Sequence, residues 1–315
     1  MKLKKVIITG ACGQDGYYLS RLLARLDIEI IGIVKKLPLK PHKYFNKMIK
    51  CNLKEFGKFR DIVLSEKPDV IFNLGAPSSG QNMDQNSEEQ FDVNLGFVFK
   101  ILNFLDSENI KTHFIQASSS EVFALNNVSP QIETSNFRPK TIYGLTKATA
   151  DFIIRYYREV KNLKVSSAIL YNHESPIRRE EFVTKKITSA AAEIYLGHRK
   201  NLKLGSIDVR RDWLHAIDVC EGLFKIAINR PNDYIISRGK TYSIKDVLFI
   251  AFNYLGLDYQ EYVVIDKKFN HSPDIIERVG DNSKIKLDLK WKPSISFERM
   301  IIEMVRFDLR RLMTK

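Results

Sequence analysis

The chain has 315 residues, of which 44% are hydrophobic, so it is long enough to fold around a sizeable core. Its 50 Lys and Arg residues outnumber its 37 Asp and Glu residues, which gives a net charge of +13. The basic residues are scattered through amphipathic segments and no RNA or DNA module signature is present. We therefore expect an acidic small-molecule ligand and no nucleic-acid partner.

The three cysteines (Cys12, Cys51 and Cys220) lie far apart and have neither disulfide-framework nor zinc spacing. This pattern favours a reducing compartment, so we expect a cytoplasmic protein without a structural metal. The apolar run near the N-terminus is too short for a signal peptide. No stretch approaches the roughly 18 apolar residues that cross a bilayer, so we expect no membrane partner.

In chain order, apolar runs typical of parallel strands alternate with segments that carry apolar residues at helical spacing. Strands are predicted at 5–10, 28–34, 69–76, 112–120 and 164–172, and helices at 16–26, 52–66, 92–108 and 145–162. This series predicts an α/β fold with a Rossmann-type doubly wound parallel sheet.

After Asn172 the alternation breaks and a region of helices and short strands begins. We therefore predict an NADP-binding Rossmann domain at residues 1–172. A smaller α/β C-terminal substrate region is predicted at residues 173–315, partly interleaved with the first.

A glycine-rich loop follows the first predicted strand, with Gly10, Gly13 and Gly16 in G-x-x-G-x-x-G spacing and Gln14 and Asp15 between the last two glycines. Glycines let the turn tighten and let the backbone approach a diphosphate, which the helix N-terminus also favours. A glycine pattern alone is also compatible with an ordinary turn. Its position between a strand and a helix favours a dinucleotide-binding loop formed by these five residues.

The end of the second predicted strand indicates which dinucleotide is bound. Lys35 and Lys36 occupy the region where an acidic residue would hold the ribose hydroxyl of NAD. Lysines suit a 2′-phosphate, so NADP is preferred over NAD. The alternative is that both lysines are merely solvated.

The glycine spacing, together with Tyr143 and Lys147 in a Tyr-x-x-x-Lys motif, resembles the extended short-chain dehydrogenase/reductase family. The resemblance implies that Tyr143 is the acid/base, and that Lys147 holds the nicotinamide ribose and lowers the pKa of the tyrosine. It also implies that a hydroxyl at the end of the fifth strand, here that of Ser119, acts together with the tyrosine and the lysine in catalysis. One helical turn separates the tyrosine and the lysine, so both side chains can point into one cleft.

Glu121 lies two residues after that hydroxyl, as a glutamate does in sugar-nucleotide 4,6-dehydratases. In such enzymes oxidation at sugar C4 acidifies the C5 hydrogen. A carboxylate then removes this hydrogen so that water can leave from C6. The resemblance therefore assigns Ser119, Glu121, Tyr143 and Lys147 as the catalytic residues.

The resemblance narrows further to the GDP-mannose 4,6-dehydratase family, through the stretches GACGQDGYYL, NHESP with FVTKKIT, LGSIDVRRDWLHAIDV and KIKLDLKWKP. It implies a hydro-lyase in deoxysugar biosynthesis. It implies further cofactor contacts at Asn52, Leu53, Leu74, Ala76, Lys147, His173 and Arg178. It implies substrate contacts at Ser78, Ser79, Asn172, Val183, Lys186 and Arg211.

Several positions depart from the family pattern. Ser119 replaces a threonine, and Asn52 stands where an aspartate usually meets adenine. Ser272 and Ile275 replace an arginine and a glutamate expected to hold the nucleotide, and the loop after the fourth strand also differs. Both ends of the substrate pocket are thus altered, which suggests the same reaction on another sugar nucleotide. A GDP-mannose-like sugar, GDP-heptose and GDP-N-acetylhexosamine are candidates, and the base stays open.

Two other functions stay open from the sequence. One is a sugar-nucleotide 4-reductase or epimerase of the same family, in which Glu121 is incidental. The other is a non-catalytic NADP-binding homologue. The helices that begin near Gly96 and Tyr143 form a dimer in this family, so we expect a homodimer or homotetramer.

Overall fold

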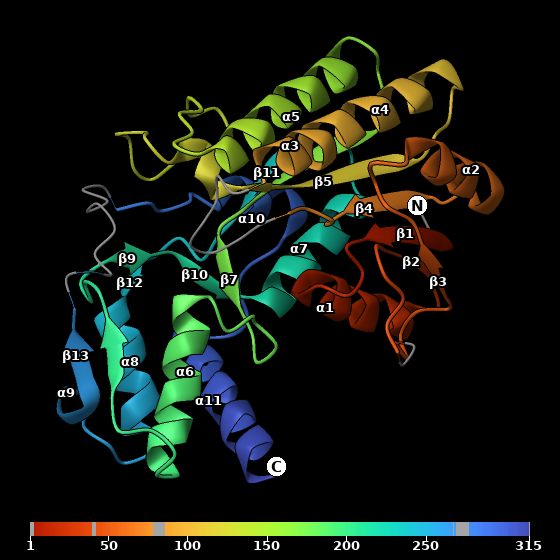
Figure 1. Ribbon diagram of the computed structural model, residues 1–315. Helices are drawn as coiled ribbons and strands as arrows, with labels where there is room; N and C mark the ends of the chain where they lie inside the picture. Colours follow the sequence, from red (N-terminus) through yellow and green to blue (C-terminus); the bar gives the residue numbers. More distant parts are fainter. Residues whose placement is uncertain (1–2, 40–41, 78–85, 267, 269–276, 315) are drawn as a thin grey trace.

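A seven-stranded parallel sheet forms the centre of the computed structural model, which describes residues 3–39, 42–77, 86–266, 268 and 277–314 (Figure 1). The strand order is β3-β2-β1-β4-β5-β6-β11. The strands are β1 (Lys5–Thr9), β2 (Glu29–Val34), β3 (Lys47–Lys50), β4 (Val70–Asn73), β5 (His113–Ser119), β6 (Val165–Leu170) and β11 (Tyr234–Ile236). The chain moves outward from β1 to β3 and then returns to the other side of β1 as β4, so the predicted doubly wound fold is confirmed.

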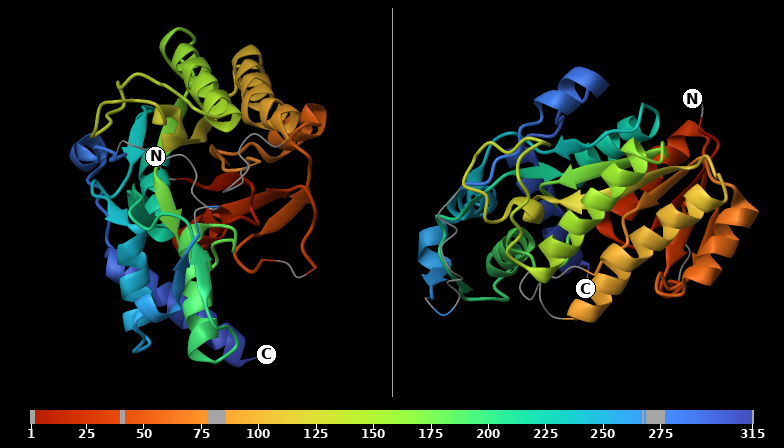
Figure 2. Two further views of the ribbon diagram at one scale, coloured as in Figure 1. Left: turned by 60° about the vertical axis from the view of Figure 1, so that its left-hand side comes forward. Right: turned by 90° about the horizontal axis from the view of Figure 1, so that it is seen from above.

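Helices cover both faces of this sheet (Figure 2). One face carries α1 (Gln14–Leu23), α7 (Ala216–Ala227) and α10 (Ser283–Leu289). The other carries α2 (Phe56–Glu66), α4 (Phe97–Ser107) and α5 (Ile142–Glu159), and the short α3 (Ser87–Gln90) precedes α4. Alternate residues of one strand serve the two cores: Val6 and Ile8 pack with α1, and Ile7 packs on the opposite side.

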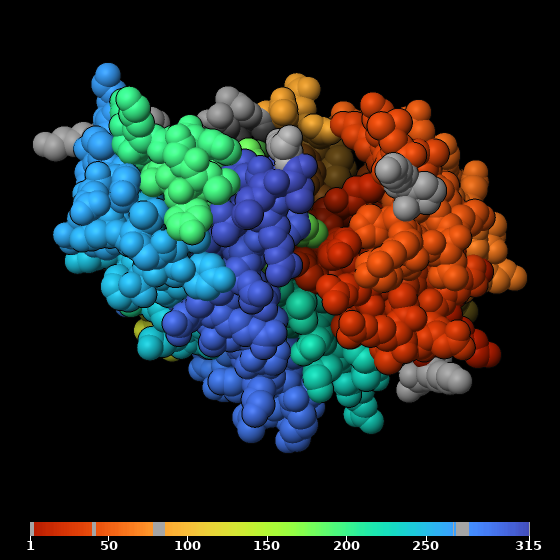
Figure 3. All heavy atoms as spheres, turned by 90° about the horizontal axis from the view of Figure 1, so that it is seen from below, coloured from red at the N-terminus to blue at the C-terminus, as the bar shows by residue number. Residues whose placement is uncertain are grey.

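A third core lies in the C-terminal region, between α6 (Val183–Tyr195), α8 (Ile244–Asn253) and α11 (Phe297–Met313). Three pairs of short strands and one short helix complete this region. They are β7 (Asn172–Glu174) with β10 (Trp213–His215), β8 (Leu202–Leu204) with β13 (Val263–Ile265), β9 (Arg210–Arg211) with β12 (Tyr242–Ser243), and α9 (Tyr259–Tyr262). Figure 3 shows the C-terminal residues packed against the N-terminal half on one face of the molecule.

The two regions share the central sheet. Strand β7 begins at Asn172, but the chain returns to the sheet with α7 and adds β11 beside β6. We propose the boundary at residue 172 on this basis, with the segment from α7 to β11 interleaved into the first region. None of the described helices has the combination of length and apolar character that a membrane-spanning segment requires.

Helix α5 approaches the end of β5 unusually closely. The Thr141 hydroxyl caps the helix by accepting a hydrogen bond from the Gly144 amide at 3.1 Å. A β-carbon at Gly144 would lie 2.8 Å from the Glu121 carbonyl oxygen, so only glycine permits this contact. The short 3₁₀ turn Ser120–Phe123, which holds Glu121, is therefore packed directly against the first turn of α5.

Buried polar contacts also join α5 to the sheet. Asp151 is fully buried, and it accepts hydrogen bonds from Ser118 on β5 at 2.5 Å and from Ser167 on β6 at 2.6 Å. Burial raises the pKa of Asp151 to about 6, although both serine hydroxyls oppose the shift. The aspartate thus fixes the rotation of α5 about its axis relative to two strands.

Replacing Gly144 with alanine should destabilise the protein by about 1 to 3 kcal/mol, because the added methyl group overlaps the Glu121 carbonyl. The free energy of unfolding in urea measures this effect. Gly57→Ala is the matched control, since a β-carbon there meets no other atom within 4 Å on the exposed side of α2. The control should stabilise the protein by about 0.5 to 1 kcal/mol. Equal effects of the two substitutions would contradict the packing described.

Replacing Asp151 with asparagine should change the pH dependence of stability. The pKa of Asp151 is raised on folding, so its stabilising contribution is complete below about pH 4 and is lost as the pH rises through about 6. The asparagine side chain of the variant cannot ionise. The free energy of unfolding of the variant, relative to wild type, should therefore increase by about 2 to 3 kcal/mol between about pH 4 and pH 8.

The control for this experiment is Asp61→Asn, which removes one negative charge at an exposed position. Urea unfolding at several pH values measures both variants. A difference between Asp151→Asn and wild type that does not change with pH would contradict the role given to burial.

Candidate active site

The carboxyl ends of β1, β4, β5 and β6 meet at one edge of the sheet, and most of the predicted site residues follow these strands. In an open α/β sheet, ligands bind in the crevice at this edge where the strand order reverses. Here the reversal lies between β1 and β4. The loops after these two strands are therefore the expected floor of the site.

The glycine loop after β1 forms a cradle without side chains. Gly10 has φ +66, and a β-carbon there would lie 2.8 Å from the Cα atom of Gly75, which follows β4. A β-carbon at Gly16 would lie 2.6 Å from the Ala11 carbonyl oxygen. Gly13 immediately precedes α1, whose N-terminus favours negative charge. These features fit the diphosphate of a dinucleotide.

The other predicted floor residues lie beside this cradle. Leu74 and Ala76 flank Gly75 and are half-buried, and the Gly75 amide donates to the Thr9 hydroxyl at 2.9 Å. The Leu53 side chain lies 3.1 Å from where a Gly75 β-carbon would stand. Asn52 uses its side-chain oxygen to accept from the Lys54 amide at 3.2 Å, within its own loop.

Two of the predicted cofactor residues contact each other. His173 Nε2 lies 3.1 Å from Asp15 Oδ2, and His173 Nδ1 lies 2.7 Å from the Tyr171 carbonyl oxygen. Burial disfavours the charged histidine, but the Asp15 carboxylate raises the pKa of His173 above its usual value. Gln14 donates to the His173 carbonyl at 3.1 Å and accepts from Ser175 at 2.6 Å. The glycine loop and the segment after β6 are thereby joined.

Arg178 lies beside this group. Its Nε atom is 3.2 Å from a carboxylate oxygen of Glu174, and its guanidinium lies 3.5 Å from the centre of the Phe182 ring. Its positive charge also favours the ionised form of Asp15. Arg178 is thus held near the glycine loop, where a phosphate would interact with it favourably.

The lysines used to predict NADP lie at the end of β2, and both are exposed. Lys35 Nζ lies 2.8 Å from a carboxylate oxygen of Glu89. This exposed ion pair was not anticipated from the sequence. Binding of a 2′-phosphate by Lys35 would have to compete with it.

Ser119, Glu121 and Tyr143 lie together at the end of β5. The Ser119 hydroxyl accepts from the Glu121 amide at 3.3 Å. Burial raises the pKa of Tyr143 to about 12; the nearby Ser119 hydroxyl opposes this shift, and the charge of Glu121 adds to it. The glutamate and the phenol therefore lie close enough to affect each other.

Lys147 lies one turn after Tyr143 on α5 and is buried. Its Nζ atom lies 5.8 Å from the centre of the Tyr143 ring and donates to the Ala117 carbonyl at 2.7 Å. Burial lowers the pKa of Lys147 to about 8. Burial of the phenol dominates the shift of the Tyr143 pKa, and the Lys147 ammonium group donates to a strand carbonyl, so the lowering of this pKa by Lys147 stays a prediction.

Arg278 is a site residue that the sequence did not reveal. Its Nη1 atom donates to Glu121 Oε1 at 2.9 Å, and the two residues are 157 positions apart. No local motif surrounds Arg278, so spacing could not have identified it. The structure thus places a guanidinium next to the Glu121 carboxylate, close to Tyr143.

The predicted substrate residues are distributed over the C-terminal region. Asn172 is half-buried on β7, Val183 begins α6, and Arg211 on β9 donates to the Arg210 carbonyl at 2.8 Å. Ser78, Ser79, Ser272 and Ile275 lie outside the described residues. Lys186, on α6, has a different environment.

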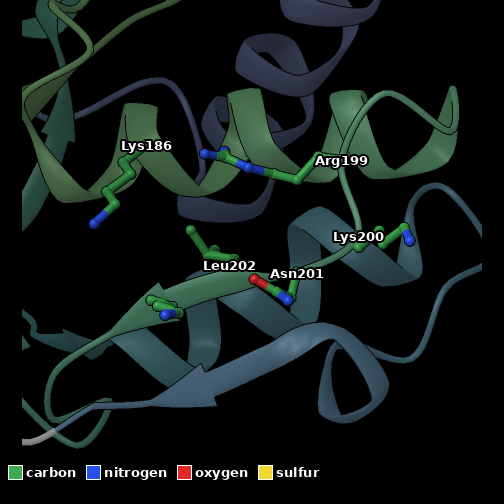
Figure 4. A pocket seen from close by; sticks show the side chains of 6 residues that line it. Lys186, Arg199, Lys200, Asn201 and Leu202 are labelled. Carbon is green, nitrogen blue, oxygen red and sulfur yellow. The ribbon is translucent and has the colours of Figure 1, made fainter.

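Lys186 lines an open pocket of about 340 Å³ between α6 and β8 (Figure 4). Arg199, Lys200 and Lys203 line the same pocket, and the close-up shows the Arg199 side chain directed along α6 toward Lys186. Burial, followed by the charge of Arg199, lowers the pKa of Lys186. The pocket does not include Glu121 or Tyr143. The basic residues at 198–203 could have indicated this pocket from the sequence.

This arrangement provides a diphosphate cradle, a carboxylate close to a phenol at the end of β5, and a separate cationic pocket. The residues present fit a bound nicotinamide dinucleotide, because side chains that would fill the phosphate cradle are absent at Gly10, Gly13 and Gly16. Tyr143 and Glu121 can each accept or donate a proton there.

Comparison with known proteins supports this description. The family model described as GDP-mannose 4,6 dehydratase matches residues 7–304. GDP-mannose 4,6 dehydratase 1 of Arabidopsis thaliana is 32% identical over 325 residues, which cover 97% of this chain and 90% of that protein.

Two solved structures have the same fold. The dTDP-glucose 4,6-dehydratase of Bacillus anthracis in complex with NAD superposes with a TM-score of 0.81 at 20% identity, covering 96% of each chain. RMD from Pseudomonas aeruginosa complexed with NADPH superposes with a TM-score of 0.82 at 19% identity, covering 98% of this chain and 100% of that one. The family model and the full-length relative, together with the shared fold, show that this chain belongs to the GDP-mannose 4,6-dehydratase family.

Proposed function

We propose that the protein is an NADP-dependent sugar-nucleotide 4,6-dehydratase that converts a nucleoside-diphosphate hexose to its 4-keto-6-deoxy form. The observation that carries this proposal is the position of Glu121 in the turn after β5, where its amide donates to Ser119 and its charge acts on the Tyr143 phenol. A reductase or epimerase needs a group that moves a proton at O4. Elimination of water needs a second group at C5, and Glu121 is suitably placed to serve as that base.

In this proposal Tyr143 acts first. It accepts the proton of the sugar O4 hydroxyl while C4 is oxidised, and the nearby Ser119 hydroxyl favours the ionised phenol. A bound oxidised nicotinamide would take the hydrogen and electron pair from C4 and later return them to C6. A positive charge near the Tyr143 phenol stabilises its ionised form. A cation bound there would therefore lower the pKa that burial raises.

Glu121 acts second. The 4-ketone acidifies the C5 hydrogen, and Glu121 removes it as a proton. The C5–H electron pair becomes the C5–C6 double bond, and the C6–O bond breaks with its electrons going to oxygen. Glu121 then passes its proton to the departing oxygen, which leaves as water. The carboxylate is restored by this step. Return of the hydrogen and electron pair to C6 would be accompanied by uptake of a proton at C5, which the proton that Tyr143 accepted at O4 balances.

The cationic pocket at α6 and β8 would hold the nucleotide end of the substrate. Four basic side chains line it, and phosphate oxygens interact strongly with lysine and arginine. A volume of about 340 Å³ lies within the range found for small-molecule sites. The sugar is proposed to be GDP-mannose-like, GDP-heptose or GDP-N-acetylhexosamine. We also propose that the protein acts as a cytoplasmic homodimer or homotetramer.

The function is tested by incubating the protein and NADP with a panel of nucleotide sugars. Mass spectrometry should find one sugar nucleotide that loses the mass of water without added NADPH. Reduction or epimerisation without loss of water would instead indicate a sugar-nucleotide 4-reductase or epimerase. Absence of any turnover would indicate a non-catalytic NADP-binding homologue.

Replacing Glu121 with glutamine should slow loss of water by about 10²- to 10⁴-fold, because the amide cannot accept the C5 proton. Oxidation at C4 should continue, so reduced nicotinamide should accumulate and be visible by its absorbance. Glu108→Gln, at the exposed end of α4, is the control and should behave as wild type. Undiminished dehydration by the Glu121 variant would contradict the mechanism.

Replacing Lys186 with alanine should weaken nucleotide binding by about 10-fold, the effect of losing one charge-assisted contact with phosphate. Titration calorimetry with GDP, UDP and dTDP measures the dissociation constants. Lys58→Ala on α2 is the control, because this exposed lysine lies on the far side of the sheet from α6 (Figure 1). Unchanged affinity in the Lys186 variant would exclude this pocket as the nucleotide site.

A further inference from the structure

Arg278 and Glu121 form a largely buried ion pair at the proposed reaction centre. The Arg278 side chain is 10% exposed and the Glu121 side chain is 19% exposed, with 2.9 Å between Nη1 and Oε1. At this depth, solvent screens the interaction less than at the surface. Leaving either charge without its partner would be unfavourable, so the contact constrains both side chains.

The backbone that follows Arg278 is held rigidly. The Val279 carbonyl accepts from the Gln131 amide at 2.8 Å, and the Asp281 amide donates to the Gln131 carbonyl at 2.8 Å. Ser237 donates to the Gly280 carbonyl at 2.7 Å. A β-carbon at Gly280 would lie 2.6 Å from the Tyr171 ring, so the chain packs closely there. The base of the Arg278 side chain therefore has a defined position.

Glu121 is held at two points. Its amide donates to the Ser119 hydroxyl at 3.3 Å, and its Oε1 atom accepts from Arg278. Within the described part of the chain, no further hydrogen bond to the Glu121 carboxylate is found. Among these residues no donor therefore occupies the second oxygen, Oε2, and the charge of Glu121 acts on the nearby Tyr143 phenol.

An arginine suits this task because its guanidinium stays protonated throughout the accessible pH range. It can orient the carboxylate without taking part in proton transfer. Glu277, the residue before Arg278, instead forms a surface ion pair with Arg210 at 3.1 Å. Of the two carboxylates, Glu121 is therefore the one that contacts Arg278.

We propose that Arg278 is a positioning residue that holds the Glu121 carboxylate by one oxygen and directs the other oxygen toward the C5 hydrogen of the sugar. This inference rests on the proposed 4,6-dehydratase function. With this role for Arg278, the two halves of the reaction depend on different residues. Oxidation at C4 depends on Tyr143, whereas elimination of water depends on Glu121 and, through it, on Arg278.

The kinetic test compares wild type with Arg278→Met, which keeps a long side chain and removes the charge. The substrate is the sugar nucleotide found by the mass-spectrometry panel. The kcat for loss of water should fall by about 10- to 100-fold, the effect expected of a misplaced reacting group, while KM stays within about twofold. Oxidation at C4 should persist, so reduced nicotinamide should accumulate during turnover. Arg278→Lys should recover part of the rate, and Arg60→Met, an exposed arginine on α2, should match wild type.

Three kinetic results would overturn the inference. A rise in KM alone would make Arg278 a substrate contact. An equal loss of C4 oxidation and of elimination, with a lower melting temperature, would make its role purely structural. Unchanged kinetics would make the ion pair incidental.

Crystallography tests the positioning independently of activity. Wild-type crystals should contain the Arg278–Glu121 contact, and the Arg278→Met variant should show the Glu121 carboxylate in a different orientation. An unmoved carboxylate would overturn the inference even if the enzyme proved active. Conversely, wild-type protein that turns over no sugar nucleotide would refute the proposed function, and the crystal structures would still decide whether Arg278 orients Glu121.

Discussion

The close contact between Gly144 and the Glu121 carbonyl is the constraint on which the candidate site depends. It brings the first turn of α5 against the 3₁₀ turn after β5, which places the Tyr143 phenol close to the Glu121 carboxylate. The Thr141 cap starts the helix at this point, and Asp151 fixes its rotation by accepting from two strands. The proposed chemistry therefore depends on backbone packing as much as on the reactive side chains.

Charged groups around this site are neutralised in pairs between distant segments. Asp15 contacts His173, and Glu121 contacts Arg278. Burial of a single charge is costly, so each contact constrains the segments that carry it. These pairs tie the glycine loop to the segment after β6, and the turn after β5 to the C-terminal region. A site between two regions of the chain is thereby preorganised.

The two ends of the proposed substrate meet different environments. The sugar end would lie beside the partly buried Glu121 and Tyr143 side chains, where burial raises the pKa of the phenol strongly. The nucleotide end would lie in an open pocket lined by Lys186 and three further basic side chains. Family membership does not determine which sugar is accepted, because substrate choice depends on individual contacts at both ends.

The sequence by itself determined the fold class, the glycine loop and the Tyr143–Lys147 pair, because each depends on residues close together in the chain. It did not reveal β3 or β11: β3 has a lysine at each end and is not buried, and β11 has only three residues, so neither forms a long apolar run. Only the tertiary structure decided that Arg278 contacts Glu121, that Lys35 contacts Glu89 and that Lys147 donates to a strand carbonyl. These contacts join residues 157, 54 and 30 positions apart, so they arise from the packing of the folded chain and leave no local spacing to recognise.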